Sequence, residues 1–100
     1  NYPKNVDEFE ICDLQKANCN LVSVPRISKS PASLECKLFQ VLKLPGKDNN
    51  MIIGEVVGIH LSDDFLKNGI FDILDFMPIA RLGYKDYTTI SKKFALERPD

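Results

Sequence analysis

The side chain best suited to acid–base or ligand chemistry is that of His60, the only histidine among 100 residues. It ends the stretch "MIIGEVVGIHLSDD", in which strand alternation places Gly54, Gly58 and His60 on one face. Two glycines on one strand face often mark a close approach by a ligand or by another backbone. Two interpretations stay open. A flat ligand lies over the glycines beside His60, or the glycines allow curvature or a bulge and His60 ends the strand at the surface.

Other ligand-forming side chains give weaker signals. Cys12, Cys19 and Cys36 have no C-x-x-C spacing, which argues against a disulfide framework and a zinc cluster. The acids Asp63 and Asp64 are typical of the first turn of a helix. We therefore predict structural, reduced cysteines and no metal site.

Two glutamates, Glu35 and Glu55, lie inside predicted strands. A strand glutamate is usually exposed to solvent or paired with a cation. For both residues the sequence favours a salt bridge with Arg26 or Lys37 over a catalytic role.

Composition narrows the class of protein. Thirteen basic and fourteen acidic residues give a net charge of −1, so the chain lacks the positive charge that drives nucleic-acid binding. The apolar runs are too short for a membrane-spanning helix, and no basic-then-apolar leader opens the chain. We predict a cytoplasmic protein with no nucleic-acid or membrane partner, and the absence of a starting methionine raises the possibility of a fragment.

Alternation and turn residues predict the elements that position these side chains. In chain order they are a short helix capped by Asn5, a tethered loop or edge segment containing Pro25 and Pro31, a half-buried strand over 33–44, a hairpin loop "PGKDNN", a strand over 51–61, a turn at 68–69, a short helix over 72–76, and strands over 79–82 and 87–90 around a Gly83 turn.

Four blocks in order, "VDEFE", "PRISKSPASLECKL", "IIGEVVGIHLSDD" and "PIARLGYKDY", resemble the later part of the flavin reductase-like, FMN-binding split-barrel family. The resemblance implies a mainly β fold with short helices, forming part of a Greek-key split β-barrel. It further implies that residues 1–100 are a single domain, the C-terminal portion of a larger flavin reductase-like domain whose N-terminal half is absent here.

The family resemblance implies an NAD(P)H:flavin oxidoreductase that passes a hydride from nicotinamide to flavin N5. His60 would lie near the flavin edge or the nicotinamide, Arg81 would bind a carbonyl or phosphate, and Tyr87 would close one side of the ring pocket. The implied cofactor is FMN, with NAD(P)H as possible co-substrate. The implied site has His60 as its catalytic residue and Gly54, Gly58, Arg81, Gly83 and Tyr87 as its cofactor-binding residues.

Alternatives remain at each level. Instead of binding a ligand, Arg81 could form a surface ion pair with Asp75 or Asp86. Tyr87 could be a packed aromatic side chain. At the level of function, the alternative is a non-catalytic flavin-binding or protein-interaction split-barrel fragment.

The chain departs from the family pattern at two turns. The family usually has a glycine pair after Arg-Leu, whereas Gly83 is followed here by Tyr84. After the first helix the family tends to read Ala-Gly-Leu-Thr, and this chain has Asp13 in place of that glycine.

A barrel without its earlier half exposes unpaired strand edges. We therefore expect either a homodimer or a complementing N-terminal segment to cover them. Enzyme activity is expected of the intact domain and is doubtful for this chain alone.

Overall fold

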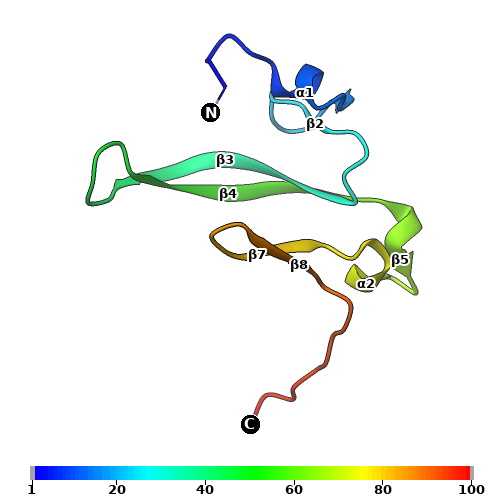
Figure 1. Cartoon of the computed structure of the whole chain (residues 1–100). Coiled ribbons are helices and arrows are strands. Elements are labelled where there is room, and N and C mark those ends of the chain that lie inside the picture. The colour runs from blue at the N-terminus through cyan, green and yellow to red at the C-terminus, as the bar shows by residue number, and fades with distance from the viewer. Residues whose placement is uncertain (1, 100) are drawn as a thin grey trace. The chain divides into compact units, whose positions relative to one another are not determined.

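The computed structural model describes residues 2–99, which divide into two compact units that meet between His60 and Leu61. Within residues 2–99 the strands form four separate two-stranded sheets, joined by short helices and turns (Figure 1). In the same range no helix is both long and apolar enough to cross a membrane.

The main element of the first unit is a hairpin of two long strands, β3 (Ala32–Lys43) and β4 (Asn50–Leu61) (Figure 1). The loop closes where the Leu44 N–H donates to the Asn49 carbonyl at 2.9 Å. The Asn49 side-chain amide also donates to the Pro45 carbonyl at 3.0 Å. The two predicted strands and their loop are confirmed to within one residue at each end.

A single helical turn, α1 (Glu8–Ile11), precedes the hairpin. Its N-cap is Asp7, whose carboxylate accepts the Phe9 N–H at 3.0 Å and is also paired with the Lys16 ammonium. The prediction of Asn5 as the cap was wrong by two residues, because Asp7 combines extended backbone with a carboxylate that reaches the first turn.

The predicted loop around Pro25 contains a small sheet of its own. Strand β1 (Lys16–Ala17) pairs antiparallel with β2 (Arg26–Ile27). Two-residue strands show no alternation, so the sequence pattern could not predict them. An open hollow of about 150 Å³ lies between this sheet and α1, lined by Glu8, Phe9, Cys12, Leu14 and Ile27.

The second unit is organised around three phenylalanine rings. It contains the 3₁₀ helix η1 (Asp63–Phe65), the hairpin of β5 (Leu66–Lys67) and β6 (Ile70–Phe71), and helix α2 (Ile73–Phe76). The ring of Phe65 lies 5.4 Å from that of Phe76, and the ring of Phe71 lies 5.2 Å from that of Phe76, measured between centroids. The Phe65–Phe76 pair is edge-to-face and the Phe71–Phe76 pair is tilted. Aromatic pairs of this kind stabilise a cluster beyond its buried area.

The predicted turn at 68–69 is confirmed, since Asn68 and Gly69 have φ of 51° and 76° and join β5 to β6. The predicted helix over 72–76 is confirmed as α2, which Asp72 caps through the Leu74 N–H at 3.1 Å. The unit then continues as an antiparallel hairpin of β7 (Ile79–Gly83) and β8 (Asp86–Thr89).

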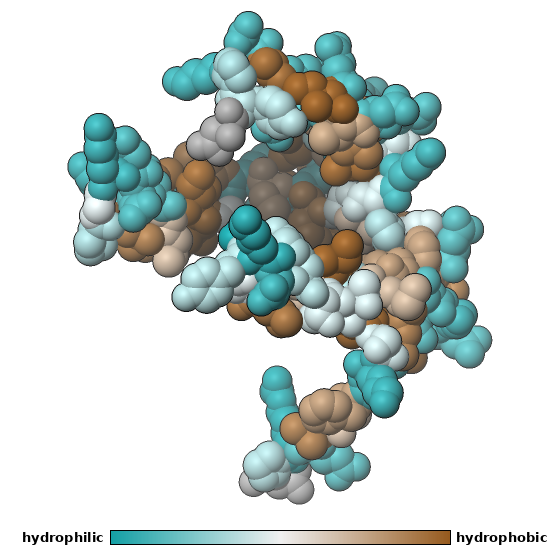
Figure 2. All heavy atoms as spheres, viewed as in Figure 1, coloured by the Kyte–Doolittle hydropathy of each residue, from teal (hydrophilic) through white to brown (hydrophobic). Residues whose placement is uncertain are grey.

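The apolar side chains of the long hairpin are largely exposed. Leu34, Leu38 and Phe39 are 60%, 68% and 70% exposed, and no apolar residue among those described is fully buried. Figure 2 shows brown hydrophobic side chains uncovered next to the teal hydrophilic loop of the hairpin. The prediction of a half-buried strand was wrong for β3 in this chain, because no second layer in the first unit covers the faces of the sheet.

Candidate functional site

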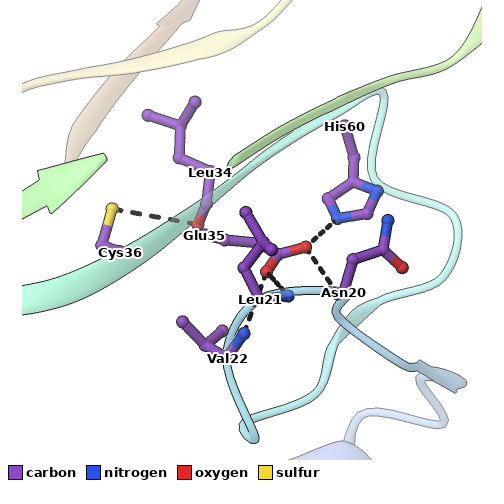
Figure 3. A network of polar contacts seen from close by, with 7 residues as sticks. All are labelled: Asn20, Leu21, Val22, Leu34, Glu35, Cys36 and His60. Carbon is purple, nitrogen blue, oxygen red and sulfur yellow. Dashed lines mark hydrogen bonds and ion pairs between the residues drawn. The ribbon is translucent and has the colours of Figure 1, made fainter. Parts of the chain in front are cut away.

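The only residue that is buried among those described is charged: Glu35, on β3, is 2% exposed. One carboxylate oxygen accepts the Asn20 N–H at 2.8 Å, and the other accepts the Leu21 and Val22 N–H groups at 2.6 and 3.1 Å. The first oxygen also contacts His60 Nε2 at 2.5 Å (Figure 3). We call this set of five residues the Glu35 network.

These hydrogen bonds favour the ionised form of Glu35. The Asn20 N–H, together with the His60 ring and the Leu21 and Val22 N–H groups, lowers the pKa of the Glu35 carboxyl from its ordinary 4.5 to about 2, against the opposing effect of burial. At neutral pH the carboxylate is therefore charged. It fixes the loop over residues 20–22 to the end of the hairpin.

Gly58 on β4 makes room for this arrangement. A Cβ atom there would lie 3.3 Å from the Glu35 carboxyl carbon and 3.3 Å from a methyl group of Leu21. At Gly54 a Cβ atom would lie 3.1 Å from the Cβ of Cys36. The close approach at both glycines is therefore made by other parts of this chain, and their assignment to a flavin stays a prediction.

His60 lies at the end of β4, with 19% of its side chain exposed. Its Nε2 is engaged by Glu35, as Figure 3 shows, so Nδ1 is the ring nitrogen left for another partner. A carboxylate that accepts from one imidazole nitrogen fixes the orientation and tautomer of the ring. The site therefore offers a positioned imidazole.

A thiol completes this group. A ligand atom of Cys19, one of Glu35 and one of His60 all lie within 4.8 Å of one another. Cys19 is partly buried, directly before Asn20 in the loop that the carboxylate holds. All three cysteines are free, and Cys12 and Cys36 are exposed rather than buried in a core.

The salt bridge predicted between Glu35 and Arg26 or Lys37 was wrong. Glu35 takes backbone N–H groups and an imidazole as its partners, because its side chain points toward the 20–22 loop rather than toward solvent cations. Arg26 lies on β2 with its Nε buried and without a hydrogen-bond partner among residues 2–99.

In the second unit, the β7–β8 register sets Arg81 directly opposite Tyr87. The Arg81 guanidinium donates to the Tyr84 carbonyl at 3.1 Å, and Tyr87 is 61% exposed rather than packed. Among residues 2–99, Arg81 forms no ion pair with Asp75 or Asp86, and Asp75 is paired with Lys67 at 2.7 Å.

The space at Gly83 is open, because a Cβ placed there would meet nothing within 4 Å. Arg81, Gly83 and Tyr87 therefore lie together on one exposed hairpin. The first unit contains Gly54, Gly58 and His60. The predicted site residues are therefore divided between the two units.

Both departures from the family pattern fall on left-handed backbone. Asp13 has φ of 50° and Tyr84 has φ of 45°, at positions where the family resemblance implies glycine. Asp adopts this conformation more readily than most side chains, whereas Tyr pays a larger steric cost. Both turns therefore use left-handed backbone without the glycine that suits it best.

Sequence reasoning missed Glu35 as the organising residue. Its partners lie 13 to 25 residues away along the chain, beyond the reach of a periodic pattern. The one local signal was Gly58, the position with no side chain, where a Cβ atom would lie 3.4 Å from the Cβ of Glu35.

The fold is shared with solved proteins. Nitrilotriacetate monooxygenase component B from Bacillus cereus superposes with a TM-score of 0.85 at 27% identity, over 96% of this chain and 50% of that one. A Shewanella frigidimarina protein described as a flavin reductase with a split-barrel domain superposes with a TM-score of 0.83 at 24% identity, over 99% of this chain and 50% of that one. The chain is thus mainly β with short helices and has the fold of part of a split barrel.

Comparison of amino-acid sequences agrees with the comparison of folds. The family profile described as "Flavin reductase like domain" matches residues 1–86, so the chain belongs to the flavin reductase-like domain family. An uncharacterized protein of Halalkalibacterium halodurans is 32% identical over 97% of this chain and 48% of its own length. The chain therefore spans about half the length of the relatives that it matches.

Proposed function

We propose that this chain is one half of an FMN-binding flavin reductase of the NAD(P)H:flavin oxidoreductase type, working in the cytoplasm. The observation that carries the proposal is the family match over residues 1–86, which agrees with the likeness to a monooxygenase component of known structure. A bound flavin would supply the redox chemistry, taking up a hydride from a nicotinamide at N5.

The residues of the β7–β8 hairpin fit such a group in their chemistry. Arg81 holds one donor on the Tyr84 carbonyl and keeps others for a phosphate or a ring carbonyl. Gly83 leaves open space beside it, and the exposed Tyr87 ring offers a face for stacking. These three residues would bind and orient the flavin.

His60 enters the proposal as a catalytic residue through Nδ1, because Glu35 occupies Nε2. In that position it would donate a hydrogen bond or carry a proton beside the reacting rings. Glu35 acts through His60 as a positioning residue.

We further propose that a complementing segment, equivalent to the other half of the longer relatives, covers the long hairpin. The support is the exposed apolar surface of β3 and β4, together with the half-length match. Uncovered apolar strands of this length are typical of interfaces. A homodimer of this chain is the alternative arrangement.

The second candidate function is a non-catalytic split-barrel module that binds flavin or protein. The exposed apolar hairpin favours it, because such a surface serves association whether or not a reaction follows.

The test is a titration of FMN into the 100-residue chain, followed by flavin fluorescence and by light scattering for mass. Saturable quenching that weakens at least tenfold in Arg81→Ala, with Lys85→Ala as the matched control on the same hairpin, supports the flavin site. NAD(P)H oxidation then separates the enzyme from the module, and His60→Ala tests the catalytic residue.

Two outcomes contradict the proposal. The flavin site is refuted if FMN fails to bind both this chain and a version extended with the family's other half. The complementing segment and the homodimer are both refuted if the chain is a monodisperse monomer with cooperative unfolding.

A further inference from the structure

Three kinds of metal-ligating side chain meet at the Glu35 network. The ligand atoms of three side chains lie within 4.8 Å of one another: the thiol of Cys19, the carboxylate of Glu35 and the imidazole of His60. The first belongs to the loop that the carboxylate holds, the second to β3 and the third to the end of β4. Sulfur, oxygen and nitrogen ligands of these types are the set that Zn²⁺ takes in proteins.

We propose that Cys19, Glu35 and His60 together bind one divalent transition-metal ion of the zinc class. Three protein ligands leave the fourth tetrahedral position open for water or a small ligand, as in zinc sites that do chemistry. The site shares His60 and Glu35 with the flavin proposal, but metal binding is tested without flavin.

The hydrogen-bond capacity of Glu35 leaves one place for the ion. A carboxylate has about four acceptor positions. Backbone N–H groups of Asn20, Leu21 and Val22 occupy three of them, and the imidazole occupies the fourth at 2.5 Å. A cation that replaces the proton between Glu35 and His60 keeps all three backbone bonds, so the loop need not open.

The charges of the site also suit a divalent ion. Glu35 is buried and accepts three backbone N–H groups, and within residues 2–99 it forms no ion pair with Lys or Arg. Buried carboxylates are commonly paired with a cation or coordinate a metal. With the thiol of Cys19 deprotonated, the ligand set carries two negative charges, which a divalent cation neutralises while the proton of the thiol goes to solvent.

The geometry needs only a small adjustment. Ligand atoms at about 2.0 to 2.3 Å from a tetrahedral zinc ion lie roughly 3.3 to 3.8 Å apart. His60 Nε2 already lies 2.5 Å from Glu35, so this pair must open by roughly 0.8 Å to admit the ion, whereas the Cys19 sulfur, which lies within 4.8 Å of both, must move inward by up to about 1 Å. Glu35 is anchored by the backbone, so His60 and Cys19 supply these movements.

The sequence did not predict this site, because metal motifs are recognised by short spacing and these residues are 16 and 25 positions apart. The hairpin and the bound loop bring them together. The chain also provides its own controls, since Cys12 and Cys36 are exposed free thiols outside the cluster.

The test is a titration of the reduced 100-residue chain with Co²⁺, a spectroscopic substitute for zinc. We expect one ion per chain, with the thiolate-to-cobalt charge-transfer band of a Cys ligand, and loss of that band when Zn²⁺ is added. Cys19→Ser should remove the band and His60→Ala should weaken binding at least tenfold. Cys12→Ser and Cys36→Ser should leave both unchanged, and far-UV circular dichroism checks that each variant is folded.

The proposal is overturned by either of two results. Co²⁺ in excess gives no charge-transfer band, or the band survives in Cys19→Ser. In the first case, the His60–Glu35 contact is a hydrogen bond only.

Discussion

Each of the two units of this chain is stabilised internally by a different kind of interaction. In the first unit a buried carboxylate gathers three backbone N–H groups and an imidazole. In the second, the rings of Phe65, Phe71 and Phe76 pack against one another with centroids 5.2 to 6.4 Å apart. One arrangement depends on charge and direction, and the other depends on apolar contact.

The difference indicates where chemistry can be located. Apolar rings stabilise their unit without offering a reactive group, whereas the Glu35 network stabilises a loop and positions His60 and Cys19 at the same time. A network in which one carboxylate serves four partners is also vulnerable, because losing that group leaves three backbone N–H donors without their acceptor. The two units should therefore respond differently to mutation and to acid.

The largest effect is expected from Glu35→Ala, which removes all four contacts and leaves the N–H groups of Asn20, Leu21 and Val22 without their acceptor. Urea unfolding followed by circular dichroism should show a marked loss of stability. Glu35→Gln, which keeps one acceptor oxygen, should lie between wild type and Glu35→Ala. Equal stability of all three proteins would show that the carboxylate does not organise the unit.

Acid should loosen the first unit selectively. The pKa of the Glu35 carboxyl is lowered in the folded chain from 4.5 to about 2, so its stabilising contribution is complete above pH 4.5 and is lost as the pH falls toward 2. NMR chemical shifts of Asn20 to Val22 should change in that range before those of the phenylalanine rings. Glu35→Gln is the control and should lack this transition; a transition of the same size in that variant contradicts the assignment.

A smaller effect is expected from Phe71→Ala. The side chain is only partly buried, so we expect a loss of about 1–2 kcal/mol, below the ~3–5 kcal/mol typical of a fully buried phenylalanine. Thermal or urea unfolding measures the change, which should be the same at pH 7 and pH 4. A loss of stability that differs strongly between pH 7 and pH 4 would contradict the claim that the second unit, unlike the first, depends on apolar contact rather than on charge.

Much of the fold could be predicted from local patterns. The hairpin of β3 and β4 follows from two alternating runs around "PGKDNN", and α2 follows from Asp72 as its cap and Pro78 beyond its end. The sheet of β1 and β2 could not be predicted, because two-residue strands carry no period. Burial was misjudged in β3, since alternation shows which residues share a face but not whether anything covers that face.

The candidate site was predictable only in part. His60 and Gly58 stood out by residue type and spacing, and both lie next to Glu35. The role of Glu35 depends on a loop that folds back across 13 to 15 residues, and that of Cys19 depends on the same loop. Such contacts are set by tertiary structure, which a single sequence read by periodicity does not specify.

Amide hydrogen exchange at Asn20, Leu21 and Val22 tests most directly the claim that one carboxylate organises the first unit. At neutral pH these three N–H groups should exchange at least tenfold more slowly than that of the exposed Ser23, and Glu35→Gln should remove most of the difference. Exchange as fast as that of Ser23 in the wild-type chain would contradict the claim.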